Sequence, residues 1–329
     1  MRFMSKLSRQ VILVLLVGGL AFWPTNCGSP TKQLPNGSEF LMFTYFGSHA
    51  FESSIMIAHP DGSHITTLLP AQSTVGYEAG YGNSLSQYVL VYFAELGAAG
   101  TQVNKLQIYR PLLDRFESIP LPPGDAGPAT PSPDGTMYAT VASPLDFLWE
   151  GRIWVVKLST GAVTQLTQYD GLSYQDSSPV WSPDGQWIAF LRLDLSQAPN
   201  YHINVYRVRP DGTELTPLTP GDEFINAIGY APDGQLMLTS RNGIELLNPS
   251  TQQRTVVLSN TMFPTTTYQL QGAGIGWSRT QGTIVWPMFN KSLNRHEMWS
   301  VNPDGSDFRM LFRADPSVWM MSQMSVVAR

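Results

Sequence analysis

Six aspartates of this chain stand in the same sequence context, a Pro-Asp-Gly triplet, and are therefore its most regularly repeated titratable side chains. Such carboxylates could bind a metal ion or act as general acids. However, proline presets φ, aspartate bonds to the local backbone and glycine accepts positive φ, so each triplet also predicts a tight turn. A catalytic acid is needed once, whereas a turn is needed in every repeat, and the recurrence therefore favours a structural role. The triplets begin at Pro60, Pro133, Pro183, Pro210, Pro232 and Pro303.

The other titratable residues form no known catalytic or metal-binding pattern. Among the five histidines only His59 and His64 are close in sequence, and their spacing is not that of a zinc motif. The chain contains no Gly-x-Ser-x-Gly nucleophile elbow. We therefore expect no catalytic residue, no metal and no cofactor.

The spacing of the triplets predicts the elements that position them. One set, at residues 133, 183 and 232, steps by 50 and 49 residues. The second set, at 60, 210 and 303, has gaps of 150 and 93 residues, which are about three and two such steps. β-Branched and aromatic residues flank each turn, as in the segment 203–218, and predict β-hairpins. Each repeat thus holds two hairpins, and four strands repeated every ~40 to 50 residues are typical of a β-propeller blade.

Chain length sets the number of blades. Residues 38–329 hold about six repeats, so we predict an all-β, six-bladed propeller of four-stranded antiparallel blades. The first blade lacks an inner strand, and the segment 316–324 lacks a hairpin partner. We expect the C-terminal segment to supply the missing strand and leave no open edge. The blades are expected at residues 40–69, 84–121, 128–167, 178–219, 224–259 and 272–313.

The fourth repeat also resembles a known family. Its core Trp181-Ser-Pro-Asp-Gly-Gln-Trp-Ile-Ala-Phe190, followed by Arg209-Pro-Asp-Gly-Thr-Glu-Leu-Thr-Pro-Leu218, is similar to the TolB-type WD-like propeller repeat. The resemblance extends over the whole ring and is faintest in the second blade. It implies a six-bladed propeller of the kind used as a binding platform in the bacterial envelope. We expect neither an α/β domain before the ring nor a hydrolase domain after it, so no activity of such domains is inferred.

The N-terminal residues have the layout of a secretory signal. Arg2, Lys6 and Arg9 precede the uncharged run 11–23, which at about 1.5 Å per residue is short for a ~30 Å hydrocarbon core. Because the basic residues come first, the rest of the chain is expected on the far side of a membrane. We assign residues 1–26 to a signal or anchor segment, 27–38 to a flexible tether and 39–329 to the propeller.

Cys27, the only cysteine, follows this run closely. Its position favours lipid attachment as a bacterial lipoprotein, whereas the preceding residues Pro24, Thr25 and Asn26 differ from the small residues of the lipoprotein pattern. An uncleaved anchor and ordinary secretion are the alternatives. In each case the lone cysteine forms no internal disulfide, and stability must come from the propeller core.

Composition argues against one class of partner. The segment before Cys27 holds three basic residues and no acidic one, so 17 basic and 25 acidic residues follow it, a net charge of −8. No cluster of Lys or Arg offsets this charge, and nucleic acid is therefore not an expected partner. We expect a monomer that contacts the membrane only through its N-terminus.

Insertions between the second and third strands of successive repeats are the candidate binding surface, since loops carry function on such scaffolds. We expect these loops on one face, where they would contact a protein or peptide. Their candidate partner-face residues are Phe147, Trp149, Glu150, Tyr201, His202, Arg295 and His296. The links between repeats are expected on the opposite face, at the mouth of the central channel. Their candidate carboxylates are Asp170, Asp176, Asp222 and Glu223.

Large aromatic residues recur at one repeat position. Trp181, Trp277 and Trp319 share it, and Tyr230 fills it in the fifth repeat. A shared position predicts packing between adjacent blades rather than a ligand cage.

Together these patterns favour a non-enzymatic, exported propeller that is tethered in a bacterial envelope and binds a protein or peptide. The alternative is an envelope enzyme or carbohydrate-binding protein that uses the four channel-mouth carboxylates. Three or more of those carboxylates within metal-binding or acid–base distance would favour the alternative.

Overall fold

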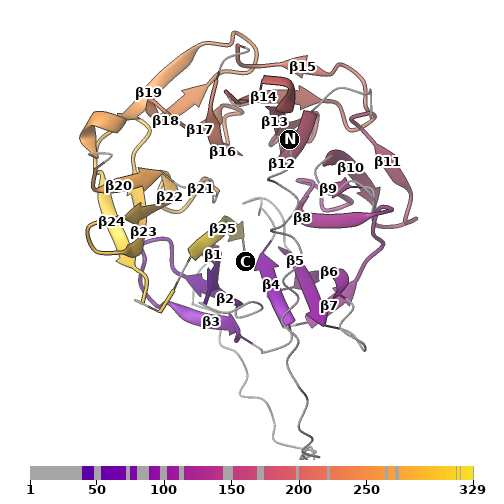
Figure 1. Cartoon of the computed structure of the whole chain (residues 1–329), viewed down its shortest axis with the longest axis horizontal. Helices are drawn as coiled ribbons and strands as arrows, with labels where there is room; N and C mark the ends of the chain where they lie inside the picture. Colours follow the sequence, from indigo (N-terminus) through magenta and orange to yellow (C-terminus); the bar gives the residue numbers. More distant parts are fainter. Residues whose placement is uncertain are drawn as a thin grey trace, which may run out of the picture. The chain divides into compact units, whose positions relative to one another are not determined.

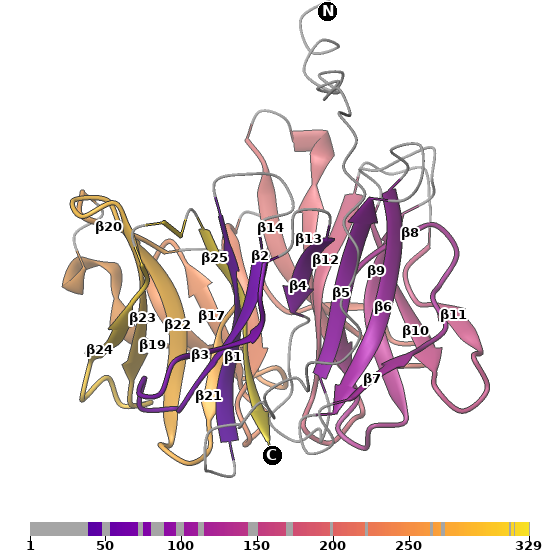
Figure 2. The ribbon, with the colours of Figure 1, turned by 90° about the horizontal axis from the view of Figure 1, so that it is seen from below.

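Six antiparallel β-sheets form a closed ring in the computed structural model, which confirms the predicted six-bladed β-propeller (Figure 1). Each sheet is one blade, and the blades stand side by side around the ring when it is viewed from the side (Figure 2). The structure describes residues 39–47, 53–71, 75–79, 89–96, 102–110, 115–143, 151–168, 174–197, 200–220, 223–263, 266–270, 274–315, 317–318 and 320–328.

The first three blades occupy the N-terminal half of the ring. Blade 1 contains β1 (Glu39–Phe46), β2 (Ser53–Ala58) and β3 (Thr66–Leu69). Blade 2 contains β4 (Val75–Ala79), β5 (Val89–Leu96), β6 (Gln102–Arg110) and β7 (Arg115–Ser118). Blade 3 contains β8 (Asp125–Pro131), β9 (Met137–Ser143), β10 (Arg152–Lys157) and β11 (Val163–Gln165).

The last three blades continue the pattern. Blade 4 contains β12 (Tyr174–Trp181), β13 (Ile188–Asp194), β14 (His202–Val208) and β15 (Thr216–Pro217). Blade 5 contains β16 (Ile225–Tyr230), β17 (Leu236–Ser240), β18 (Gly243–Leu247) and β19 (Arg254–Ser259). Blade 6 contains β20 (Tyr268–Leu270), β21 (Gly276–Ser278), β22 (Thr283–Asn290), β23 (Arg295–Val301) and β24 (Arg309–Arg313).

Two blades differ from the boundaries expected from the sequence. Blade 2 begins with β4 at Val75, earlier than the expected residue 84, because no turn triplet marks its inner strand. In blade 6 the inner strand is in two pieces, and both β20 and β21 pair with β22. The other boundaries agree with the expected ones to within a few residues.

The C-terminal strand completes blade 1, as predicted. β25 (Met320–Ala328) pairs antiparallel with β1, with Phe46 opposite Met320 and Glu39 opposite Ala328. The order of the sheet is β25-β1-β2-β3, so the last strand of the chain is the inner strand of the first blade.

Glu39 ties the start of β1 to blade 6. Its carboxylate is buried and accepts hydrogen bonds from the backbone N–H groups of Arg279 (2.9 Å) and Thr280 (3.1 Å). The hydroxyls of Ser278 and Thr280 donate to it as well, both at 2.8 Å. This turn joins β21 to β22 and lacks the Pro-Asp-Gly triplet, so a carboxylate from blade 1 takes over the capping role that a local aspartate has in other blades.

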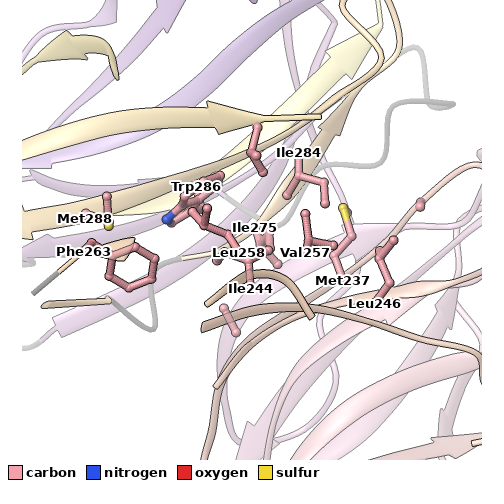
Figure 3. Packing of buried hydrophobic residues seen from close by; sticks show 13 residues of the cluster. Met237, Ile244, Leu246, Val257, Leu258, Phe263, Ile275, Ile284, Trp286 and Met288 are labelled. Atoms are coloured by element: carbon pink, nitrogen blue, oxygen red, sulfur yellow. The ribbon is translucent and has the colours of Figure 1, made fainter. Parts of the chain in front are cut away.

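The hydrophobic core lies between blades rather than in one central layer. Six clusters of buried side chains are found in the described residues, and each combines residues of two adjacent blades. Figure 3 shows the cluster between blades 5 and 6, in which the fully buried Trp286 packs with Phe263, Leu258 and Met288. Every blade therefore needs a neighbour on both sides to bury its two faces.

All six Pro-Asp-Gly triplets form the predicted turns. In each, the glycine has positive φ, between 69° and 86°. The aspartate Oδ1 accepts the backbone N–H two residues on, at 2.8 to 3.0 Å. The triplets at 133, 183 and 232 join the first and second strands of blades 3, 4 and 5, and those at 60, 210 and 303 join the third and fourth strands of blades 1, 4 and 6.

Glycines of the second set also contact the preceding blade. A Cβ atom at Gly305 would lie 2.6 Å from the carbonyl oxygen of Val257 in blade 5, and one at Gly62 would lie 2.7 Å from Leu311 in blade 6. In contrast, a Cβ at Gly234, in the first set, meets no atom within 4 Å. The same triplet thus serves as a simple turn in one place and as a close contact between blades in the other.

This contrast gives a matched pair of substitutions. Gly234→Ala, at φ 85°, is expected to lower the free energy of unfolding by about 1 kcal/mol, the cost of a left-handed alanine. Gly305→Ala, at φ 84°, is expected to lose clearly more, because its Cβ also clashes with Val257. Urea unfolding of both variants measures the difference. Equal losses would show that the contact between blades contributes nothing.

Candidate functional site

The loops between second and third strands and the links between blades lie on one face, which corrects the expectation that they lie on opposite faces. In blade 4, Ile203 follows the β13–β14 loop and donates its N–H to the carbonyl oxygen of Glu223 in the next link, at 2.8 Å. In blade 5, Asn260 N donates to Asn242 O at 2.8 Å. The antiparallel order of four strands explains this, since the second and fourth connections must leave the same edge of the sheet. We call this edge the loop face.

The opposite edge carries the connections between first and second strands and between third and fourth strands. All six Pro-Asp-Gly turns therefore lie there, and we call it the turn face. Local hydrogen bonds, above all from Ser132, Ser63, Thr213 and Ser306, lower the pKa of four turn aspartates, Asp134, Asp61, Asp211 and Asp304. These carboxylates are thus held ionised as turn caps.

The predicted partner-face residues do not all lie in exposed loops. Tyr201 is 44% exposed and precedes β14, where the half-buried His202 pairs with Asp194. Arg295 lies at the start of β23, and its guanidinium donates to the carbonyl oxygen of Ala314 at 2.8 Å. Phe147, Trp149 and Glu150 lie outside the described residues.

His296 does not lie on the exposed loop where the sequence placed it. Its side chain is only 2% exposed, and its ring packs against Phe289 with centroids 4.8 Å apart. The turn from β22 to β23 needs only residues 291–294, so His296 is already the second residue of a strand and faces inward. It is a core residue and not part of a partner surface.

The two described candidate carboxylates are both engaged in ion pairs. Asp176 is fully buried and accepts Arg192 Nε at 2.6 Å and Nη2 at 2.8 Å. Glu223 accepts Arg254 Nη1 at 2.6 Å, and the same guanidinium pairs with the buried Glu245. Asp170 and Asp222 lie outside the described residues.

Aromatic rings surround the Asp176–Arg192 pair. The guanidinium carbon of Arg192 lies 4.8 Å from the ring centroid of Tyr206 and 5.2 and 5.4 Å from those of Tyr174 and Phe190. This bidentate pair with cation–π contacts fixes β12 against β13 and β14.

A buried arginine holds the link between blades 3 and 4 at both ends. Arg152 Nε donates to the carbonyl oxygen of Gln168 at 3.0 Å, and Nη1 donates to that of Tyr174 at 2.6 Å. The residues between Gln168 and Tyr174 include Asp170, so Arg152 sets where this candidate segment leaves and re-enters the ring.

The structure adds exposed residues to the loop face that sequence reasoning missed. Met262, in the link after β19, is 63% exposed, and Leu293, in the β22–β23 turn, is 51% exposed. Arg241, in the β17–β18 turn, lies over the ring of Phe224 with its guanidinium carbon 5.3 Å from the centroid. Apolar residues inside short turns were the available signal, since a turn cannot bury them within its own blade.

The repeated aromatic position is used for packing between blades, as predicted. Trp181 is buried in the cluster that joins blades 3 and 4, and its indole N–H donates to the carbonyl oxygen of Thr130 at 3.1 Å. Trp277 packs against the cluster between blades 5 and 6, and Tyr230 against that between blades 4 and 5. Trp319 lies outside the described residues.

Within the part of the chain that the structure describes, no three His, Cys, Asp or Glu side chains are placed to hold a metal ion. The described segments also contain no helix long and apolar enough to cross a membrane. Cys27 lies outside them.

Solved structures share this fold, whereas no family model and no curated protein matches the chain. TolB from Acinetobacter baumannii superposes with a TM-score of 0.63 at 17% identity, over 88% of this chain and 66% of that one. A putative TolB from Agrobacterium tumefaciens gives 0.55 at 16%, over 89% and 99%. An oligogalacturonate lyase in complex with manganese gives 0.53 at 12%, over 85% and 75%.

These similarities establish a class of fold. The chain is a six-bladed β-propeller, and its fold is similar to that of the TolB structures. At such identities the likeness shows the fold alone and no activity.

The Asp176–Arg192 pair can be tested as a structural element. Asp176→Asn leaves a buried guanidinium without its carboxylate and is expected to lower the free energy of unfolding by about 3 kcal/mol. Glu214→Gln is the control, because Glu214 pairs with Arg209 at the surface and its side chain is 58% exposed, so the expected loss is below about 0.5 kcal/mol. Chemical unfolding of both variants measures this, and a loss for Asp176→Asn as small as the control's would contradict the assignment.

Proposed function

We propose that this protein is a non-enzymatic β-propeller that is exported, tethered in a bacterial envelope, and binds a protein or peptide on its loop face. One observation carries the proposal: Tyr201, Met262 and Leu293 are exposed large apolar side chains, and all three lie in loops or links of that face. Exposed apolar groups on one rim are typical of an interaction surface.

The surroundings of these three residues support the same conclusion. Arg241, in the β17–β18 turn of blade 5, stacks on Phe224, which lies in the link that precedes this blade. Aromatic residues, Met and Arg are enriched at protein interfaces. Backbone hydrogen bonds between loops and links, such as Lys291 N to Thr267 O at 2.7 Å, give this surface a fixed shape.

An envelope enzyme or carbohydrate-binding protein is the second candidate, because a lyase shares the fold. It would need Asp170 and Asp222 to join Asp176 and Glu223 in one site. The ion pairs of Asp176 with Arg192 and of Glu223 with Arg254 favour binding over acid–base chemistry, since a paired carboxylate is poorly available for proton transfer.

The loop face can be tested by a triple variant, Tyr201→Ser, Met262→Ser and Leu293→Ser. We expect recovery of the partner from cross-linked envelope extracts to fall by about tenfold or more, because such anchors dominate binding energy. The control is Ile65→Ser, Leu215→Ser and Met310→Ser, which removes similarly exposed apolar groups elsewhere. Equal recovery with both triple variants would refute the choice of surface.

The tether is tested separately by mass spectrometry of the N-terminus of the mature protein. A diacylglyceryl group on Cys27 is expected, with residues 1–26 removed. An unmodified Cys27, or an intact segment beginning at Met1, would contradict lipidation and leave secretion or an uncleaved anchor.

A further inference from the structure

A pocket of about 350 Å³ lies on the turn face, between blades 4 and 5. Its walls are the Pro-Asp-Gly turns that begin at Pro183 and Pro232, the end of β14 and the β18–β19 turn. The side chains that face it include Asp184, Trp187, Arg207, Tyr230, Asp233 and Asn248. This volume is near the lower limit for ligand pockets and suits a molecule of amino-acid or dipeptide size.

Arg207 is a cation without an ionic partner. Its guanidinium carbon lies 4.0 Å from the ring centroid of Trp187, and its buried Nε has no hydrogen-bond acceptor. No carboxylate in the described residues pairs with Arg207. Its neighbour Arg209 lies on the same ring, at 3.8 Å, but it pairs with Glu214 and donates to Gln186. A partly buried charge of this kind is costly unless a ligand supplies the missing acceptor.

Two carboxylates, Asp184 and Asp233, lie in the same lining, and each bonds to its own turn. Asp184 uses Oδ1 for its own turn, where it accepts Ser182 Oγ and Gln186 N. Asp233 accepts Gln235 N at Oδ1 (3.0 Å) and the side-chain amide of the same residue, Nε2, at Oδ2 (2.8 Å). Neither is within ion-pair distance of Arg207 in these described segments. The pocket therefore presents separated charges of both signs.

Tyr230 adds a phenol hydroxyl, a hydrogen-bond donor, to the same lining. Burial raises the pKa of its hydroxyl above the ordinary value, and the charges of Arg207 and Asp184 have smaller, opposite effects on this pKa. The phenol thus stays protonated, and it adds a second ring to that of Trp187 in the lining.

We propose that this pocket binds a small zwitterion, a free amino acid or a dipeptide. The ligand carboxylate pairs with Arg207 and accepts the Tyr230 hydroxyl, and its ammonium group lies against Asp184 and Asp233. A doubly charged phosphate fits less well, because the two aspartates repel it. The site lies on the turn face and does not depend on the function proposed for the loop face.

Calorimetric titration of the full-length chain tests this with four probes. They are alanyl-alanine, the same dipeptide with an acetylated N-terminus and an amidated C-terminus, which carries neither charge, N-acetyl-alanine, which keeps only the carboxylate, and inorganic phosphate. We expect saturable binding of alanyl-alanine, weaker binding of N-acetyl-alanine and none of the amide. Arg207→Gln should weaken alanyl-alanine binding by about tenfold or more, and Asp233→Asn should weaken it without affecting N-acetyl-alanine. Arg209→Gln is the matched control, because Arg209 stacks on the same ring outside the pocket, and its effect should stay below about twofold.

Three results would overturn the proposal. One is no saturable binding of alanyl-alanine up to about 10 mM. Another is preferred binding of phosphate, which would make this a simple anion site. The third is equal weakening by Arg207→Gln and Arg209→Gln while thermal unfolding shows both variants folded.

Discussion

The pairing of β25 with β1 is the interaction on which the ring depends. Each core cluster is shared by two adjacent blades, so no blade can bury its faces alone. The cluster between blades 1 and 6, with Leu41, Val285 and Met298, forms only when the two ends of the propeller meet. Glu39 strengthens this junction, because its buried carboxylate caps a turn of blade 6 that has no aspartate of its own. Backbone pairing and side-chain capping thus close the ring together.

Closure divides the molecule into two faces with different properties. On the turn face, aspartate and glycine fix short connections, and some glycines, such as Gly62 and Gly305, let the next blade approach closely. On the loop face, connections vary in length, and apolar residues such as Met262 and Leu293 are exposed. The partner surface that we propose lies on the loop face, and the small-molecule site that we propose, beside Arg207, lies among the turns of the other face.

The sequence was sufficient for the fold because its signals are local. A Pro-Asp-Gly turn depends on its own residues, and its recurrence predicted the blades and the strand that closes them. The position of the loop face also follows from four antiparallel strands, although the links were first expected on the other side. Trp181 could be assigned to packing because its position repeats.

Long-range partners could not be predicted, since no local pattern encodes them. Glu39 and Ser278 are 239 residues apart, and Arg192 lies 16 residues from Asp176 across a register that only the folded sheet defines. His296 was misplaced because a four-residue turn and a longer loop look alike in sequence. That Arg207 has no carboxylate partner among the described residues likewise depends on which side chains of blade 5 lie next to it in the fold.

Native-state hydrogen exchange of two segments, Glu39–Phe46 and Met320–Ala328, tests ring closure most directly. If β25 is the inner strand of blade 1, amides that bond between these strands exchange only through global opening, with the same protection as β22 in blade 6. Fast exchange in residues 320–328, while β22 stays protected, would show that the C-terminal strand does not close the ring.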